Sequence, residues 1–192
     1  INLKTKKINK NKIKLLHHGN VSSSRKLSLL IDMMRFLDND KYELTLILIH
    51  GIYEKIAYQK LRFYARGLNI KFINPVERSR LIDFSNNFDM GICFFPPTNF
   101  NLKYALPNKF FEFVQSRLAI VVGPDIEMSK YVKKYNLGVI AKKWTAKSLS
   151  DAIKSSDVKK LTFYKNQSHK YAKKLSSNDN DQMFKNIIDS FK

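Results

Sequence analysis

Residues 107–128 read PNKFFEFVQSRLAIVVGPDIEM, and this stretch decides the fold class. Pro107 is predicted to open a helix that runs to about Arg117, because proline favours the first helical position. Residues 119–122 are a short apolar run of the kind found in strands buried on both faces, and Gly123-Pro124 ends it. Residues 126–135 have helical spacing again. A helix, a buried strand and another helix in direct succession indicate a parallel sheet covered on both faces.

The same alternation continues on both sides of this stretch. Strands are predicted at residues 13–18, 42–50, 70–73, 90–95, 119–122 and 138–141. Helices are predicted between them, at residues 24–37, 53–65, 77–84 and 148–154 among others. The predicted fold class is therefore α/β, a doubly wound, Rossmann-like parallel sheet of about six strands. Residues 1–12 are interpreted as a basic linker, 13–175 as this domain and 176–192 as a C-terminal helix.

Composition limits the class of partner. The chain has 192 residues, 44% of them hydrophobic, and a formal net charge of +19. Such a charge favours nucleic acid, anionic membrane surfaces or anionic small molecules, although lysines on a solvated surface would produce it as well. Arginine is scarce and no nucleic-acid-binding motif is present, so we expect no nucleic acid partner. The single cysteine, Cys93, lies in an apolar run, and we expect a cytoplasmic protein, with attachment to the inner membrane face left open.

Ligands of doubly wound sheets bind at the carboxyl ends of the strands, so the segments that follow strands are the candidates for function. The first such segment contains Gly19, Asn20 and Arg25. Glycine allows close approach of the backbone, and Arg25, predicted in the first turn of the next helix, could donate to a diphosphate. The segment has neither a G-x-G-x-x-G pattern nor a P-loop. The alternative is that Arg25 is merely solvated.

The other candidate segments follow the third and fourth predicted strands. Asn74 and Val76 come directly after the third strand, where a simple turn is the alternative. Asn108, Lys109 and Glu112 are predicted to share one face near the helix start at Pro107, whose free N–H groups can meet an anion. A carboxylate there can accept hydrogen bonds from two hydroxyls of a sugar or ribose. The alternative is a surface ion pair between Lys109 and Glu112.

This order of segments resembles the C-terminal domain of GT-B-fold glycosyltransferases. It is most similar to the large retaining group that uses nucleotide-diphosphate sugars to build surface polysaccharides and glycolipids. The Pro-x-Lys-x-x-Glu-Phe pattern of residues 107–113, followed by residues 119–122, is the most specific piece, and the resemblance covers residues 13–175. It implies that the chain forms one half of a GT-B fold and that a missing N-terminal domain holds the acceptor.

The resemblance also implies roles for individual residues. Glu112 matches the carboxylate that binds the nucleotide ribose, while Asn108 and Lys109 fall where the diphosphate and donor sugar lie. Arg25 and Gly19 match the contacts of the first loop with the phosphates, and residues 74–76 match the contacts with the base. Tyr104 departs from the pattern, since the family often has a glutamate near that position, and Asn20 stands where many members have arginine.

The function expected from the resemblance is transfer of a glycosyl group from a nucleotide-diphosphate sugar, UDP being the preferred nucleotide, to a saccharide or lipid-linked acceptor. We expect no metal and no cofactor, because His17 and His18 have no carboxylate or cysteine at ligand spacing. No catalytic residue is predicted, since a base can come from the other half. The alternatives are a sugar-nucleotide epimerase on the same fold and a non-catalytic module that binds nucleotides or anionic surfaces.

Overall fold

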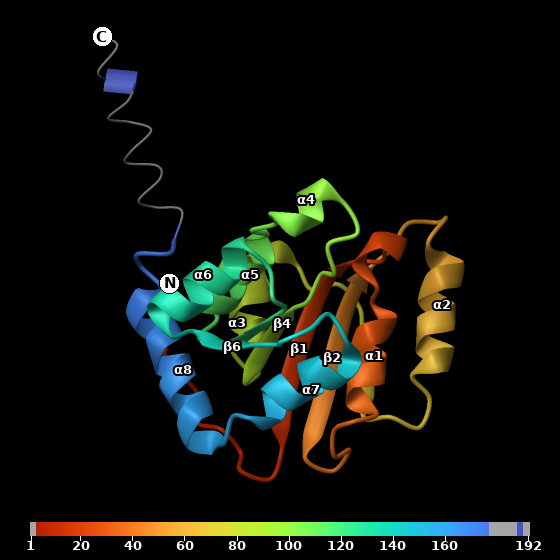
Figure 1. Cartoon of the computed structure of the whole chain (residues 1–192), viewed down its shortest axis with the longest axis horizontal. Coiled ribbons are helices and arrows are strands. Elements are labelled where there is room, and N and C mark those ends of the chain that lie inside the picture. Colours follow the sequence, from red (N-terminus) through yellow and green to blue (C-terminus); the bar gives the residue numbers. More distant parts are fainter. Residues whose placement is uncertain (1–2, 177–187, 190–192) are drawn as a thin grey trace.

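The computed structural model describes residues 3–176 and 188–189. Its centre is one six-stranded sheet in which every pairing is parallel, in the order β3-β2-β1-β4-β5-β6 (Figure 1). The strands are β1 (Ile13–Asn20), β2 (Tyr42–Ile49), β3 (Ile70–Ile73), β4 (Met90–Cys93), β5 (Ala119–Val122) and β6 (Gly138–Ile140). The predicted α/β, doubly wound parallel sheet is confirmed.

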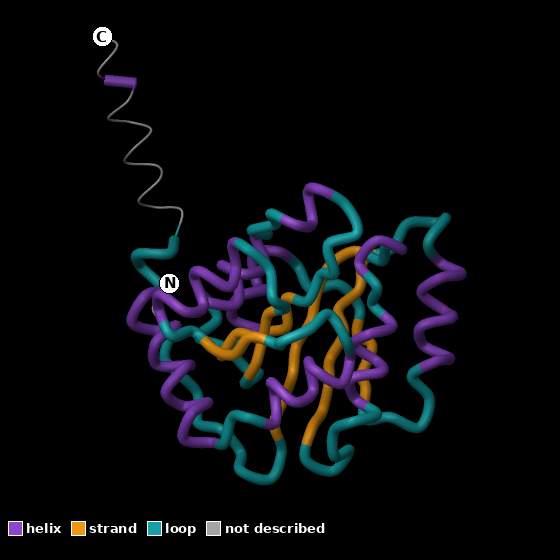
Figure 2. Tube along the Cα trace, viewed as in Figure 1, coloured by secondary structure: helices purple, strands orange, loops and turns teal. Residues whose placement is uncertain are grey.

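Helices cover both faces of the sheet (Figure 2). One face carries α1 (Ser28–Met34), α2 (Lys55–Tyr64) and α7 (Ala146–Lys154). The other carries α3 (Leu81–Ser85), α5 (Asn108–Gln115) and α6 (Glu127–Tyr135), with α8 (Val158–Tyr171) beside α5. A four-residue helix, α4 (Phe100–Lys103), and two 3-10 turns, η1 (Ser23–Arg25) and η2 (Arg78–Arg80), lie in the connections.

The core consists of two apolar clusters, one on each face of the sheet. Neighbouring strand residues point to opposite faces, so Leu15 packs in the cluster beneath α1 and α7, whereas Leu16 packs in the cluster beneath α5 and α6. Phe94 and Phe95 divide between the two clusters in the same way. Both faces of the central strands are therefore buried, which explains why their sequences are almost continuously apolar.

The strand order places a change of direction at the centre of the sheet. From β1 the chain winds outward through β2 to β3, and from β4 it winds outward the other way through β5 to β6. The connections that leave β1 and β4 therefore diverge, and sheets of this kind bind ligands between such connections, at the carboxyl ends of the strands. Any ligand site of this fold is expected there.

Three local features differ from the sequence-based prediction. β1 extends through Gly19 and Asn20, which pair with β2, so these residues belong to the strand and not to the following loop. Arg25 lies in the separate turn η1 and not in the first turn of α1, because Lys26 has a left-handed backbone (φ 48°) that ends that turn. Pro107 has extended angles (φ −75°, ψ 152°) and is the residue before α5, which begins at Asn108.

The connection after β4 contains the short helix α4. The Asn99 side chain caps it by accepting a hydrogen bond from the backbone N–H of Leu102 at 2.9 Å. Thr98 ties the start of this segment to η1, since its hydroxyl donates to the Ser24 carbonyl at 3.3 Å. The β4–α5 connection is thus attached to the β1–α1 connection at the rim of the sheet.

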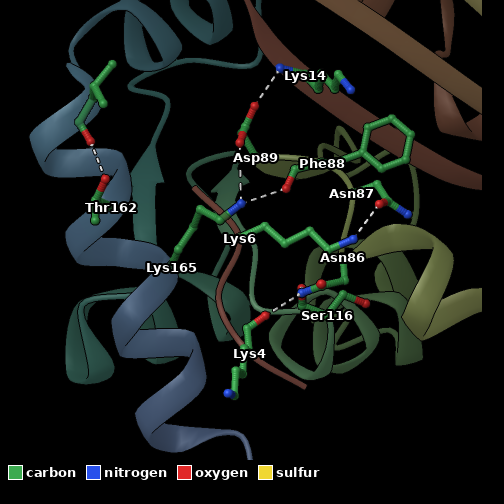
Figure 3. A network of polar contacts seen from close by, with 11 residues as sticks. Lys4, Lys6, Lys14, Asn86, Asn87, Phe88, Asp89, Ser116, Thr162 and Lys165 are labelled. Carbon is green, nitrogen blue, oxygen red and sulfur yellow. Dashed lines mark hydrogen bonds and ion pairs between the residues drawn. The ribbon is translucent and has the colours of Figure 1, made fainter. Parts of the chain in front are cut away.

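The described part of the N-terminal stretch, residues 3–12, packs on the domain (Figure 3). The Asn86 side-chain amide donates to the Lys4 carbonyl at 3.2 Å, and the Lys6 ammonium donates to Asn87 Oδ1 at 2.6 Å. Lys12 pairs with the buried Glu43 at 2.9 Å. These contacts show that side chains far along the sequence hold the described part of this stretch against the domain, and its role as a linker stays a prediction. The helix predicted over residues 176–192 lies almost entirely outside the described residues and stays a prediction.

Candidate functional site

The residues singled out at the carboxyl ends of β1 and β4 come together around Gly19. A Cβ atom placed on Gly19 would lie 2.6 Å from Lys109 Nζ and 3.0 Å from Arg25 Nη1. Gly19 also has a positive φ of 146°, which side chains rarely adopt. The backbone therefore favours glycine at this point of β1, and the missing side chain leaves room for the two cations that approach it. We call Gly19, Arg25, Lys109 and Glu112 the rim cluster.

Lys109 is the most constrained member of the rim cluster. Its side chain runs from the first turn of α5 into the protein, where only 6% of the residue is exposed. The ammonium donates a hydrogen bond to the His18 carbonyl and lies 4.7 Å from the centre of the Phe95 ring. Burial above all, together with the nearby Arg25 charge, lowers the pKa of Lys109 to about 8. Lys109 is therefore no surface residue paired with Glu112, which was the alternative interpretation.

Arg25 brings a second positive charge to the same place. It is half-buried, and its guanidinium lies 5.5 Å from the centre of the Phe95 ring, the ring that Lys109 also contacts. Within the described ranges, no carboxylate forms an ion pair with Arg25. Two cations that the fold holds close together repel each other, and an anion bound between them would relieve that repulsion.

Glu112 lies one helical turn after Lys109 and is half-buried. Burial raises the pKa of its carboxyl group, against the opposing effect of the Arg78 and Lys109 charges. Its Oε2 lies 3.6 Å from His18 Nε2, which is beyond hydrogen-bonding distance. Burial, with the help of the Lys109 charge, lowers the pKa of His18 to about 3, so the imidazole is neutral and the contact is no ion pair. The carboxylate can therefore accept hydrogen bonds from a ligand.

The remaining predicted residues lie at the same end of the sheet but outside this cluster. Asn20 ends β1 and Asn108 begins α5, and both are exposed. Asn74 is exposed after β3, while Val76 packs on the apolar cluster beside α3 and lines a hollow of about 650 Å³. In the part of the chain that the structure describes, neither shares a hydrogen bond or ring contact with the rim cluster.

Three residues of the site were not predicted as binding residues. Phe95 forms the apolar floor under both cations, and strict alternation after Phe94 would have placed it on the α5 face. His18 supplies the carbonyl that holds Lys109. Arg78, in η2, has the largest effect of any charged side chain on the pKa of Glu112. Its position depends on how the connection after β3 folds, for which the sequence has no signal.

Two further features are absent from the described ranges. No three histidine, cysteine, aspartate or glutamate side chains there come together as a metal ion would require. No described helix has the length and apolar character that crossing a membrane needs. Cys93 is buried on the α5 face of β4, as predicted, and burial raises its pKa to about 12.

No protein-family profile and no curated protein sequence matches this chain. Solved structures do. Anabaena HepE, in complex with UDP and glucose, superposes with a TM-score of 0.78 at 13% identity, covering 94% of this chain and 49% of HepE. The chain thus spans about half the length of that protein.

Two shorter structures match over nearly their whole length. The C-terminal domain of LpcC, a glycosyl transferase group 1 family protein of Francisella tularensis, has a TM-score of 0.66 at 13% identity over 85% of this chain and 86% of its own. The catalytic domain of the Helicobacter pylori cholesterol-α-glucosyltransferase has a TM-score of 0.65 at 15% identity over 85% of this chain and 99% of its own. This chain therefore has the fold of one half of the GT-B glycosyltransferases, the half represented by the C-terminal domain of the Francisella protein.

Proposed function

We propose that this chain is the donor-binding half of a glycosyltransferase and that the rim cluster holds a nucleotide-diphosphate sugar. The observation that carries the proposal is the meeting of Arg25 and Lys109 beside Gly19, with the Glu112 carboxylate one turn further along α5. Two cations suit a diphosphate, and a carboxylate with free acceptor sites suits the vicinal hydroxyls of a ribose. The geometry thus offers complementary groups for both parts of one nucleotide.

In this proposal each segment of the rim has a role. The diphosphate lies between Arg25 and Lys109, near the free backbone N–H groups at the start of α5. Gly19 lets the diphosphate approach β1 closely. Glu112 accepts from the ribose, and the base lies toward Asn74 and Val76. Asn20 and Asn108, exposed on either side, can donate to the phosphates or the donor sugar.

The same groups would support the chemistry of transfer. When the bond between sugar and diphosphate breaks, negative charge builds up on the leaving diphosphate, and cations held in place beforehand stabilise it without reorganisation. We propose UDP as the nucleotide, because UDP or a UDP-sugar is bound in the similar HepE structures. The acceptor, a saccharide or lipid-linked molecule, is proposed to bind to an N-terminal domain. Free, buried Cys93 is consistent with a reducing compartment such as the cytoplasm.

Calorimetric titration with UDP, GDP and ADP tests the proposal. Wild-type chain should bind UDP, and Glu112→Ala should weaken binding by about 1–3 kcal/mol, since one acceptor of ribose hydrogen bonds is lost. Asp151→Ala is the matched control, because it removes one exposed carboxylate of α7 and leaves the rim cluster intact. Equal affinity of the wild type and Glu112→Ala, or no nucleotide binding by the folded wild type, would refute the proposed site.

A further inference from the structure

Helix α2 has little contact with the core. It has no buried residue, although it is ten residues long, and only Tyr58 and Leu61 pack partly against the cluster beneath it. It stands at the outer edge of the molecule beyond α1 (Figure 1). Its outward side is therefore free to contact something other than this chain.

Large apolar side chains are exposed on and next to this helix. Ile56 and Phe63 are each 66% exposed, and they lie seven residues apart, so they form one line along the outward side of α2. Ile52 and Tyr53, in the connection just before the helix, are 89% and 94% exposed. Isolated apolar side chains on a surface are ordinary, but four in one continuous stretch indicate an interaction surface.

Basic side chains flank this apolar line. The segment of residues 52–66 has one acidic side chain, Glu54, and four basic ones, which are Lys55, Lys60, Arg62 and Arg66. All four basic residues are exposed. By helical spacing Lys60 lies on one side of the line through Ile56 and Phe63, and Arg66 and Lys55 lie on the other. We call these four cations and the four exposed apolar residues the α2 surface.

The pattern of the α2 surface selects its partner. Helices that lie in the plane of a membrane have an apolar line that enters the headgroup region and cations on both sides that meet anionic lipids. Long lysine and arginine stems allow the charges to stay at headgroup level while the apolar residues go deeper. Ile56 and Phe63 also line a hollow of about 990 Å³ between α2 and the η1–α1 segment. The exposed apolar surface of α2 therefore extends into this hollow.

We propose that the α2 surface docks this domain on an anionic lipid bilayer. The proposal is independent of the donor site, because none of the residues of the α2 surface belongs to the rim cluster. The connection that carries Ile52 and Tyr53 follows β2 at the carboxyl end of the sheet, the end where the rim cluster lies. Docking through this surface would hold that end of the sheet close to the membrane plane.

Flotation with vesicles of phosphatidylcholine, with and without phosphatidylglycerol, tests the charge contribution. Wild type should float with the anionic vesicles and lose most of this binding in 0.5 M salt, because the Debye length falls from about 10 Å at 0.1 M salt to about 4 Å at that strength. Lys55→Glu with Lys60→Glu should lower the partition coefficient at least about tenfold, since each cation near an anionic surface contributes about fivefold or more. Lys159→Glu with Lys170→Glu, two exposed residues of α8, makes the same change in net charge and should leave binding within about twofold.

The apolar contribution and the main rival are tested separately. Ile56→Ser with Phe63→Ser should abolish the binding that persists in salt, while UDP affinity stays unchanged. Equal loss in the α2 and α8 charge variants would overturn the proposal, because it would show that net charge alone drives binding.

Sedimentation analysis addresses the rival that two copies of this chain pair through α2. A wild-type dimer that Phe63→Ser converts to a monomer would overturn the proposal as well.

Discussion

At the scale of single residues, the decisive feature is the buried Lys109, whose ammonium lies beside Gly19. Lys109 lies in the interior with a lowered pKa, its ammonium close to Gly19, the His18 carbonyl and the Phe95 ring. A buried cation without a carboxylate partner is unfavourable for folding, since burial disfavours its charged form. A site that binds an anion offers a reason for keeping it, because the ligand supplies the missing negative charge.

The pKa of Lys109 leads to a prediction for pH dependence. An anionic ligand favours the protonated lysine, so the affinity for UDP should be highest below a pH of about 8. Above that pH the affinity should fall, approaching tenfold per pH unit for this one proton. The stability of the free protein changes in the opposite direction. Between a pH of about 8 and the ordinary lysine pKa, the unfolded chain binds more protons, so unfolding becomes harder as pH rises.

Calorimetry of UDP binding from pH 7 to pH 9 checks this prediction. Lys109→Met is the comparison, because it keeps a long apolar side chain and removes the titrating group. Its affinity should be lower at pH 7 and nearly independent of pH, apart from ionisation of UDP, which affects both proteins equally. A wild-type profile parallel to that of Lys109→Met would show that Lys109 does not contact the ligand charge.

At the scale of elements, buried polar contacts decide how the outer helices attach to the sheet. Lys165 of α8 is 1% exposed, and its ammonium donates to the Phe88 carbonyl at 2.8 Å and pairs with Asp89 at 3.3 Å, as Figure 3 shows. Asp89 in turn accepts from the backbone N–H of Lys14 at 2.9 Å at the start of β1. One side chain thus connects α8, the residues before β4 and the central strand.

Removing Lys165 should therefore destabilise the whole domain. Lys165→Met leaves the Asp89 carboxylate and the Phe88 carbonyl buried without this partner, and breaking such a buried pair costs about 3–5 kcal/mol. Lys170→Met, on the exposed side of the same helix, should change the free energy of unfolding by less than about 0.5 kcal/mol. Urea unfolding of both variants measures the difference, and similar midpoints would contradict the proposed role of the contact.

At the scale of the whole molecule, the chain has one half of a two-part fold. It spans about half of HepE, and its proposed donor site lies at one rim of the sheet. Transfer requires an acceptor hydroxyl to be oriented against the donor sugar, and such positioning accounts for a large part of the rate of enzymatic reactions. On this proposal the second half supplies that positioning.

We therefore expect the 192-residue chain to bind UDP weakly and to transfer no sugar by itself. Incubation with radiolabelled UDP-glucose and a panel of saccharide and lipid acceptors, followed by measurement of labelled product, checks this expectation. UDP binding by the same preparation controls for correct folding. Labelled product above the level obtained with Lys109→Met would show that the chain holds both substrates.

Much of the site and the fold could be predicted because the signals are local. The apolar run of residues 119–122 and the helical spacing after Pro107 depend only on neighbouring residues, and they placed Lys109 and Glu112 near the start of a helix that follows a buried strand. The rule that ligands bind where strands end then joined these residues to Gly19 and Arg25, which the structure brings close together.

What the sequence by itself determined was thus the alternation of elements, the parallel sheet and the order in which candidate residues follow its strands, because hydrophobic periodicity and glycine and proline positions encode these locally. Only the tertiary structure decided that Lys109 is buried, since helical spacing cannot show that its ammonium reaches the His18 carbonyl, 91 residues away along the chain. The same holds for the Phe95 floor and for the outward side of α2. Burial is a property of which surfaces meet, and that depends on the packing of segments that are distant in sequence.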